Sequence, residues 1–294
     1  MAKPVRIAVL SDLHIWSSVD EDSLDNALEA FDAAVATKPD HVVIAGDTFD
    51  CSTAFDEDSG RVRSALKKRG LWKPEKLSIV VGNHDIFHSP HRGSLIDRGL
   101  EWSNVRKGDA QGSYETFCEW AGALVPKKSR LSTDDIFPFE KRLRHVVLLG
   151  ADTTARVTIK SANGYWNREE DKALRGVDTD GARTVLAIHN APYESGENAG
   201  SPGEFVRRFT EEDFEMGFPE KDYERLESFA DDTGLNAIVC GHIHAGADAW
   251  AWTVGEKTKA FMVGRTGGVH GARRCIGVLE IPATGKLKWE TVRF

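Results

Sequence analysis

Short apolar runs that end in polar residues are the feature of this sequence that most constrains its fold. Runs rich in Val, Ile and Leu recur along the chain, namely VRIAVL from Val5, HVVIA from His41, LSIVV from Leu77, HVVLLG from His145, TVLAI from Thr184 and NAIVC from Asn236. Near-continuous apolar runs of this length are typical of strands buried on both faces. The sequence therefore predicts a sheet that is covered on both sides.

Amphipathic segments lie between these runs. Helical spacing of apolar residues predicts helices over 22–37, about 59–68, 114–125 and 222–232, and Asp22 or Ser23 would cap the first. Alternating strands and helices indicate an α/β fold. The C-terminal part differs, because KAFMVG, CIGVLEIP and KLKWETVRF predict strands without helices between them, and PATGK from Pro282 predicts a hairpin turn. A mixed sheet or two packed sheets would accommodate both halves.

The length of 294 residues fits one large domain or two average ones, and we predict a single domain over residues 1–294. Residues 86–135 are rich in Gly, Ser and charged side chains around one helix. We expect this segment to be an insertion that forms a cap or lid over a site.

Side chains that bind metals or transfer protons follow five of the predicted strands. The strand ends carry Asp12 with His14, Asp47 after Gly46, Asn83 with His84 and Asp85, His189, and His242 with His244. Each alone also fits an ordinary turn residue or a buried, hydrogen-bonded histidine. In an open α/β sheet, however, ligands bind outside the carboxyl ends of the strands, so we expect all five ends to converge on one crevice.

The composition of this set predicts a pair of metal ions. The candidate ligands are Asp12, His14, Asp47, Asn83, His189, His242 and His244. Oxygen and imidazole donors without thiolate suit Mn, Fe or Zn. Because seven ligands overfill one octahedral ion that also holds water, we expect two ions, about 3.5–4 Å apart and bridged by one carboxylate.

The order of these motifs resembles the calcineurin-like metallophosphoesterase superfamily. The motifs are D-x-H at 12–14, G-D at 46–47, G-N-H-D at 82–85, H-x-x-P at 189–192 and G-H-x-H at 241–244, and the resemblance runs from residue 5 to about 245. It implies a four-layer αββα sandwich, in which two mixed sheets are flanked by helices and a dinuclear site lies at the strand ends.

The resemblance also implies a role for each residue. One metal would take Asp12, His14 and His244, the other would take Asn83, His189 and His242, and Asp47 would bridge them. His84 would stabilise the developing negative charge or protonate the leaving oxygen, and Asp85 would orient its ring. A water or hydroxide that bridges two divalent cations has a lowered pKa and would attack the phosphate in line. Manganese is the favoured ion, with Fe, Zn, Ni and Co as further candidates.

Motif variants favour phosphodiesters over monoesters. After Gly46 and Asp47 the chain reads TFDCSTAF and lacks the D-R-G of the Ser/Thr protein phosphatases of this superfamily, and GNHD replaces their GNHE. The run IAGDTFD is similar to the double-strand-break repair nucleases, which keeps a DNA-end nuclease as a candidate. A phosphomonoesterase and a catalytically silent scaffold are also consistent with the sequence. Candidate substrate contacts are Trp16, TyrTrp at 165–166, His88, His91, Arg92 and the Gly-rich loop with Arg265.

Charge and cysteine usage bound the partners and the compartment. The formal net charge is -8 and the sequence has no long basic run, which disfavours nucleic acid as a partner. A small phosphate ester, such as a nucleotide-like ester, is the favoured partner. Four cysteines without C-x-x-C spacing predict reduced thiols. The N-terminus has only the short apolar run Ile7–Leu10, which predicts neither a signal peptide nor a membrane span and indicates the cytoplasm.

Overall fold

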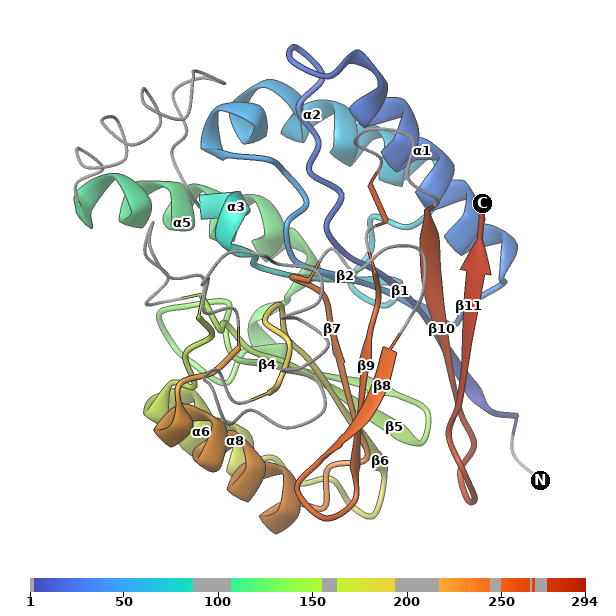
Figure 1. Ribbon diagram of the computed structural model, residues 1–294, viewed down its shortest axis with the longest axis vertical. Helices are drawn as coiled ribbons and strands as arrows, with labels where there is room; N and C mark the ends of the chain where they lie inside the picture. The colour runs from blue at the N-terminus through green and yellow to red at the C-terminus, as the bar shows by residue number, and fades with distance from the viewer. Residues whose placement is uncertain are drawn as a thin grey trace.

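Two mixed β-sheets lie at the centre of the protein, with helices on their outer faces (Figure 1). The computed structural model describes residues 3–86, 107–154, 163–193, 217–243, 250–264, 266–267 and 274–294. The first sheet has the strand order β11-β10-β1-β2-β3, and the second has the order β4-β5-β6-β7-β9-β8. The α/β class and the pair of mixed sheets flanked by helices are thereby confirmed.

The strands of the first sheet are Val5–Leu10 (β1), His41–Ala45 (β2), Leu77–Val80 (β3), Cys275–Ile281 (β10) and Lys288–Arg293 (β11). Those of the second are Phe139–Leu143 (β4), Val146–Gly150 (β5), Arg183–Ala187 (β6), Ala237–Cys240 (β7), Trp250–Val254 (β8) and Thr258–Met262 (β9). Strands β1, β2 and β3 run parallel, as do β5, β6, β7 and β9. Their carboxyl ends therefore share one edge within each sheet.

Helices cover the two outer sides. The helices are Glu21–Ala36 (α1), Ser52–Lys68 (α2), Asn83–Ile86 (α3), Lys107–Ala121 (α5), Arg168–Arg175 (α6) and Glu220–Asp232 (α8), with 3₁₀ turns at Gly122–Leu124 (η1) and Lys127–Ser129 (η2). In Figure 1, α1 and α2 lie on one side of the sheets, and α6 and α8 lie on the opposite side. This arrangement gives the four layers expected from the resemblance.

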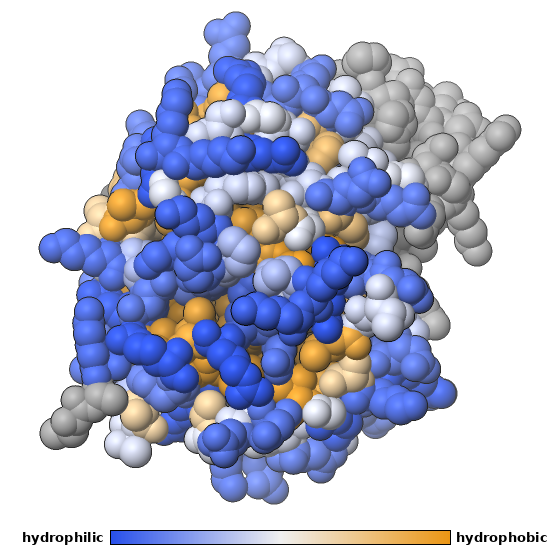
Figure 2. Space-filling model, turned by 180° about the vertical axis from the view of Figure 1, so that it is seen from behind, coloured by the Kyte–Doolittle hydropathy of each residue, from blue (hydrophilic) through white to orange (hydrophobic). Residues whose placement is uncertain are grey.

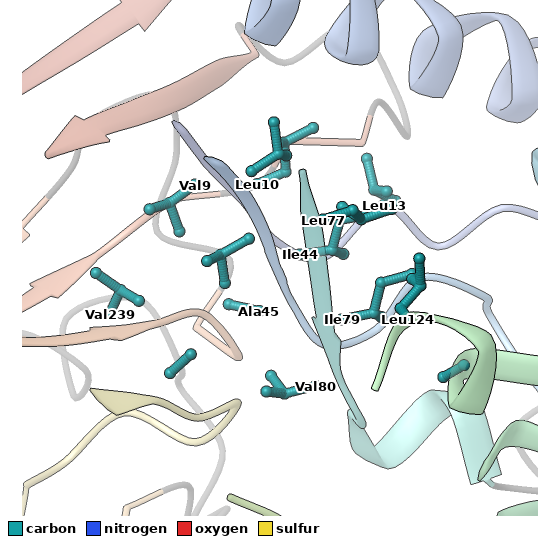
Figure 3. Close-up of a cluster of buried hydrophobic side chains, with 14 of the residues drawn as sticks. Val9, Leu10, Leu13, Ile44, Ala45, Leu77, Ile79, Val80, Leu124 and Val239 are labelled. Atoms are coloured by element: carbon teal, nitrogen blue, oxygen red, sulfur yellow. The ribbon is translucent and has the colours of Figure 1, made fainter. Parts of the chain in front are cut away.

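The second sheet is buried on both faces, and alternate residues of its strands enter different cores. In β7, Ala237 and Val239 belong to the core between the sheets, whereas Ile238 and Cys240 belong to the core under α6 and α8. Figure 3 shows Val239 in the same cluster as Val9 and Ala45 of the first sheet. Successive side chains of a strand point to opposite faces, so a continuous apolar run is needed to fill both cores.

All six apolar runs form strands, and the C-terminal hairpin between β10 and β11 is present, with Gly285 at a φ of 98° in its turn. Besides the short elements α3, η1 and η2, three longer elements of the described chain were not predicted. Strand β4 has the sequence FEKRL and helix α6 has REEDKALR, so neither shows the apolar pattern on which the predictions relied. The third, β8, is an edge strand of the second sheet.

The expected cap over 86–135 divides into two parts. Residues 87–106 lie outside the described residues. Helix α5 packs into the core, where Trp120 meets Phe49 with ring centroids 5.5 Å apart and Trp72 at 4.9 Å, and Phe117 is fully buried. The described part of this segment therefore helps to form the hydrophobic core beside the first sheet.

The outer surface is mixed in character. Figure 2 shows a face on which hydrophilic residues predominate, with apolar residues in patches among them. Among the described residues, the exposed large hydrophobic side chains are Val19 and Val35. No helix in the described ranges combines the length and the apolar character that crossing a bilayer requires.

A buried histidine at the start of β2 makes the fold sensitive to acid. His41 is fully buried, with its Nδ1 atom 3.1 Å from the Glu75 carbonyl oxygen and its Nε2 atom 2.9 Å from the Ser78 hydroxyl. Burial, together with the nearby charge of Lys141, lowers the pKa of His41 from 6.5 to about 3. The neutral ring therefore donates to the carbonyl and accepts from the hydroxyl.

We expect His41 to reduce the stability of the protein in acid. The unfolded chain takes up a proton near pH 6.5, whereas the folded protein keeps His41 neutral to about pH 3. The contribution of His41 to the free energy of unfolding is thus fully present above pH 6.5. It decreases by about 1.4 kcal/mol per pH unit as the pH falls toward 3. Urea unfolding with a chelator should show that His41→Gln loses less stability between pH 6 and 4 than the wild type. Parallel curves would contradict this assignment.

Candidate metal centre

The polar strand ends predicted from the sequence meet where the carboxyl edges of the two sheets come together. Loops after β1 and β2 supply Asp12, His14 and Asp47, and the start of α3, just after β3, supplies Asn83. Loops after β6 and β7 supply His189 and His242. These six side chains are all buried. His244, the seventh candidate ligand, lies outside the described residues.

Four of these residues have a left-handed backbone, which is unusual for residues other than glycine. The φ angles are 55° at Asp12, 45° at His14, 49° at Asp47 and 75° at His242. Such conformations cost on the order of 1–3 kcal/mol each and persist only where the surroundings impose them. The surroundings here are neighbouring loops, because the carbonyl oxygen of Asp47 accepts from the backbone N–H groups of Leu13 and His14 at 2.8 and 3.0 Å.

Two glycines allow the loops to approach closely. A Cβ atom on Gly46 would lie 2.4 Å from Nδ1 of His189, and one on Gly82 would lie 2.1 Å from the backbone nitrogen of Asp47. Neither contact is sterically allowed. The glycines of the G-D and G-N-H-D motifs therefore permit the approach that brings Asp47 and His189 together.

Asp47 lies at the centre of the group. Its Oδ2 atom is 3.3 Å from Nε2 of His189 and 3.7 Å from Nε2 of His14, and its Oδ1 atom accepts from the backbone N–H of His84 at 2.8 Å. One carboxylate therefore faces histidines from both sheets. This is the position that a bridging ligand requires.

His189 is held in the tautomer that a metal ligand needs. Its Nδ1–H donates to the carbonyl oxygen of Ala45 at 2.9 Å, which leaves the lone pair on Nε2. That Nε2 atom lies 2.9 Å from Oδ1 of Asn83 and 3.1 Å from Nδ1 of His242. Donor atoms from three strand ends thus point at one place.

The donor atoms fall into two groups that share Asp47. In one group Asp12, His14 and Asp47 each offer an atom within 4.8 Å of the others, and in the second Asp47, His189 and His242 do so. A third group consists of His14, Asp50 and His84. Buried oxygen and imidazole donors at these separations fit divalent transition metals, and a shared carboxylate fits a pair of ions.

Charges inside the group support one another. Burial alone would raise the pKa of Asp47, but the adjacent His189, His84 and His14 hold it well below its usual range. Burial would likewise lower the pKa of His189, yet the carboxylates of Asp47 and Asp12 raise it to about 9. At a buried site opposite charges attract strongly, so without a metal the Asp47 carboxylate favours a protonated His189, and a bound cation would take the place of the proton on Nε2.

The surroundings of His84 and Asp85 differ from those we expected. The carboxylate of Asp85 accepts from the backbone N–H groups of Phe49 and Gly82, each at 2.9 Å, and burial with the charge of Asp47 raises its pKa to about 7. The His84 ring instead donates from Nδ1 to the carbonyl oxygen of Asp50 at 2.9 Å. Asp85 therefore fixes the loop, and Asp50 contacts the ring.

Asp50 is a residue of the site that the sequence motifs did not predict. Its carboxylate is 3.2 Å from Nδ1 of His14 and 3.8 Å from Nδ1 of His84. The rings of His14 and His84 meet edge to face, with centroids 4.6 Å apart. Asp50 could have been identified from the sequence, because it is a second carboxylate three residues after Asp47 in the same strand-end loop.

Trp16, a candidate substrate contact, packs inside the protein. Its side chain is only 4% exposed, and its indole N–H donates to Glu57 at 3.2 Å. Trp166 is also buried and donates to Asp171 at 2.9 Å. The remaining candidate contacts, His88, His91, Arg92 and Arg265, lie outside the described residues.

Comparison with known proteins identifies the class of protein. The sequence matches the calcineurin-like phosphoesterase family over residues 5–246, so the chain belongs to this family. The family consists of dinuclear-metal phosphoesterases, and the chain carries the corresponding clusters of candidate ligands. Among curated proteins, none matches the sequence.

Two solved structures illustrate the shared fold. A dimetal phosphatase from Danio rerio is 13% identical, with a TM-score of 0.59 and 99% of both chains covered. A purple acid phosphatase from yellow lupin seeds is also 13% identical, with a TM-score of 0.62, all of this chain covered and 52% of the lupin chain covered. At this identity the similarity shows the fold alone.

Replacing the shared carboxylate should weaken metal binding. Asp47→Asn removes the negative charge that faces both donor groups, so we expect the affinity for Mn²⁺ to fall by about 10-fold or more, measured by calorimetric titration of the metal-free protein. Asp58→Asn is the matched control, because Asp58 is fully buried but binds Ser17 and Arg61. Equal loss of affinity in both variants would contradict the central place of Asp47.

Proposed function

We propose that this protein is a phosphodiesterase that hydrolyses small phosphate diesters with two divalent metal ions. The observation that supports the proposal most directly is the pair of buried donor groups that share Asp47. A nucleotide-like diester is the favoured substrate class. Hydrolysis by a metal-activated water requires no covalent intermediate on the protein.

In the proposed site one ion would be held by Asp12, His14 and His244. Asn83, His189 and His242 would hold the other, and Asp47 would contact both. When bound, the two ions supply a nucleophile near neutral pH by lowering the pKa of water, and they neutralise charge on the phosphate. Manganese is our first choice, with Fe, Zn, Ni and Co as further candidates, because the donor set is made of oxygen and imidazole nitrogen.

His84 is the proposed general acid. Its side chain is 39% exposed, unlike the buried candidate ligands beside it, so a substrate can reach it. The hydrogen bond from Nδ1 to the Asp50 carbonyl oxygen directs Nε2 away from that loop. In this position Nε2 would donate a proton to the leaving oxygen or stabilise negative charge on the phosphate. Asp50 acts as the positioning residue for this ring.

The preference for diesters is supported by the motif variants. The segment Thr48, Phe49 and Asp50 follows Asp47 without the D-R-G of the protein phosphatases, and Asp85 replaces their glutamate. The rival is a phosphomonoesterase, which is favoured by the phosphatase names of the zebrafish and lupin proteins. A DNA-end nuclease is the third candidate.

Model substrates separate these three activities. With Mn²⁺ present, we expect bis-p-nitrophenyl phosphate to be hydrolysed with a kcat/KM at least about 10-fold above that for p-nitrophenyl phosphate, a difference of about 1.4 kcal/mol in transition-state stabilisation. Linear single- and double-stranded DNA in the same buffer should remain intact. A preference for the monoester would reverse the choice, and cleavage of DNA ends would establish the nuclease instead.

Removing the proposed acid should affect chemistry and leave metal binding intact. His84→Ala is expected to lower kcat by roughly 10²-fold or more on diesters with alkyl leaving groups, and less on p-nitrophenyl esters, since a good leaving group needs little protonation. Metal content should stay at the wild-type level. His145→Ala serves as the control, because His145 binds the carbonyl oxygen of Ile281, which pairs with Val5 at the start of β1. Full activity of His84→Ala on alkyl diesters would disprove the role.

A further inference from the structure

A short turn after β9 is bonded to the loop that carries Asp12 and His14. The Thr266 hydroxyl oxygen accepts from the backbone N–H of Ser11 at 3.0 Å. In return, the backbone N–H groups of Thr266 and Gly267 donate to the carbonyl oxygens of Ser11 and Asp12, each at 3.1 Å. The turn therefore binds the backbone on both sides of the Ser11–Asp12 peptide bond.

Steric contact places the same turn against the segment between two candidate ligands. A Cβ atom on Gly267 would lie 2.0 Å from the carbonyl oxygen of Leu13 and 2.7 Å from its Cα atom. Leu13 separates Asp12 from His14 in the chain. Glycine is needed at 267 because the backbone of Leu13 occupies the space, and any side chain there would push the ligand loop.

The contact also connects the two sheets. Residue 266 follows a strand of the second sheet, whereas Ser11 follows β1 of the first. The Ser11 hydroxyl donates to the Ala45 carbonyl oxygen at 2.9 Å, and the same oxygen accepts from Nδ1 of His189. A continuous set of hydrogen bonds thus runs from Thr266 through Ser11 to the backbone atom that orients His189.

The ligand loop needs such support because its backbone is strained. Asp12 and His14 both have positive φ angles, which a non-glycine residue keeps only where external contacts outweigh the cost. The loop after β2 supplies contacts on one side, through Gly46 and Asp47. Thr266 and Gly267 supply them on the other side, and Thr266 is completely buried.

We propose that Thr266 and Gly267 are positioning residues for the metal centre. They hold the backbone at Ser11, Asp12 and Leu13, and through it they set where the Asp12 and His14 side chains present their donor atoms. This inference rests on the proposed metal site. Arg265 is a candidate substrate contact. We assign Thr266 and Gly267, the next two residues, to hold the backbone of the loop that carries Asp12 and His14.

Three threonine variants test the role of the hydroxyl. Thr266→Val keeps the shape of the side chain but removes the oxygen that accepts from the Ser11 N–H. We expect the affinity of the metal-free protein for Mn²⁺ to fall by about 10-fold or more, which is the usual effect of losing a residue that orients a metal ligand. Thr266→Ser restores the acceptor and should bind within about 2-fold of the wild type. Thr258→Val is the matched control, because Thr258 is buried in β9 and donates to Leu235 at 2.8 Å, away from the site.

Two glycine variants test the close approach independently. Gly267→Ala should displace Leu13 and weaken Mn²⁺ binding by at least about 10-fold. Gly60→Ala is its control, since a Cβ atom on Gly60 has no neighbour within 4 Å. If Thr266→Val does not fold, the glycine pair decides the question.

The outcomes separate this inference from the proposed function. If the wild type binds no divalent metal by calorimetry, the proposed function fails, and the inference fails with it. If the wild type binds but Thr266→Val and Gly267→Ala bind equally well, with thermal stability lowered only as much as in Thr258→Val, the turn is structural and the inference alone is overturned. Loss of affinity that Thr266→Ser restores supports it.

Discussion

Asp47 is the residue on which the candidate metal centre depends. Its carbonyl oxygen holds the loop after β1 through two backbone hydrogen bonds, and its carboxylate faces histidines from both sheets. A buried carboxylate would be costly alone, because burial disfavours the charged form. The neighbouring imidazoles offset that cost. Asp47 thereby organises both the backbone and the charge of the site.

The packing of the two sheets makes this arrangement possible. Alternate residues of β7 fill the core between the sheets and the core under α6 and α8, so the second sheet is held on both faces. The strand ends are then fixed relative to one another, and loops from different sheets can meet. Gly46 leaves room for the His189 ring of the second sheet, and Gly82 leaves room for Asp47 in the neighbouring loop of the first sheet. Rigid packing below the site therefore supports precise placement of donor atoms above it.

The roles of the polar residues follow from how deeply each side chain is buried. The candidate ligands are buried, and the ring of His189 is oriented by its hydrogen bond to the Ala45 carbonyl oxygen, whereas His84 remains partly exposed. Asp50 contacts His84 and His14, and Asp85 accepts from the backbone N–H groups of Gly82 in its own loop and Phe49 in the loop after β2. A buried group suits a fixed ligand, and an exposed imidazole suits proton transfer to a substrate. In our proposal, Thr266 and Gly267 fix the backbone of the ligand loop in the same way that hydrogen bonds fix the side chains.

Local sequence determined most of the strands and helices and the identity of the candidate ligands. Apolar runs such as those of β1 and β2 define strands because they must be buried on both faces, and the polar residues that follow them must lie at the sheet edge. Strand β4 and helix α6 escaped prediction because their burial depends on neighbours, not on an apolar pattern.

Tertiary structure decided which carboxylate serves which histidine. Asp85 is adjacent to His84 in sequence but binds the backbone of Phe49 and Gly82, while Asp50, thirty-four residues away from His84, contacts the ring. It also buried Trp16, and it brought Thr266 to Ser11 across 255 positions of the chain. Spacing along the chain predicts residue types at strand ends. Orientation and partners are set by the loops that pack against them, which only the fold brings together.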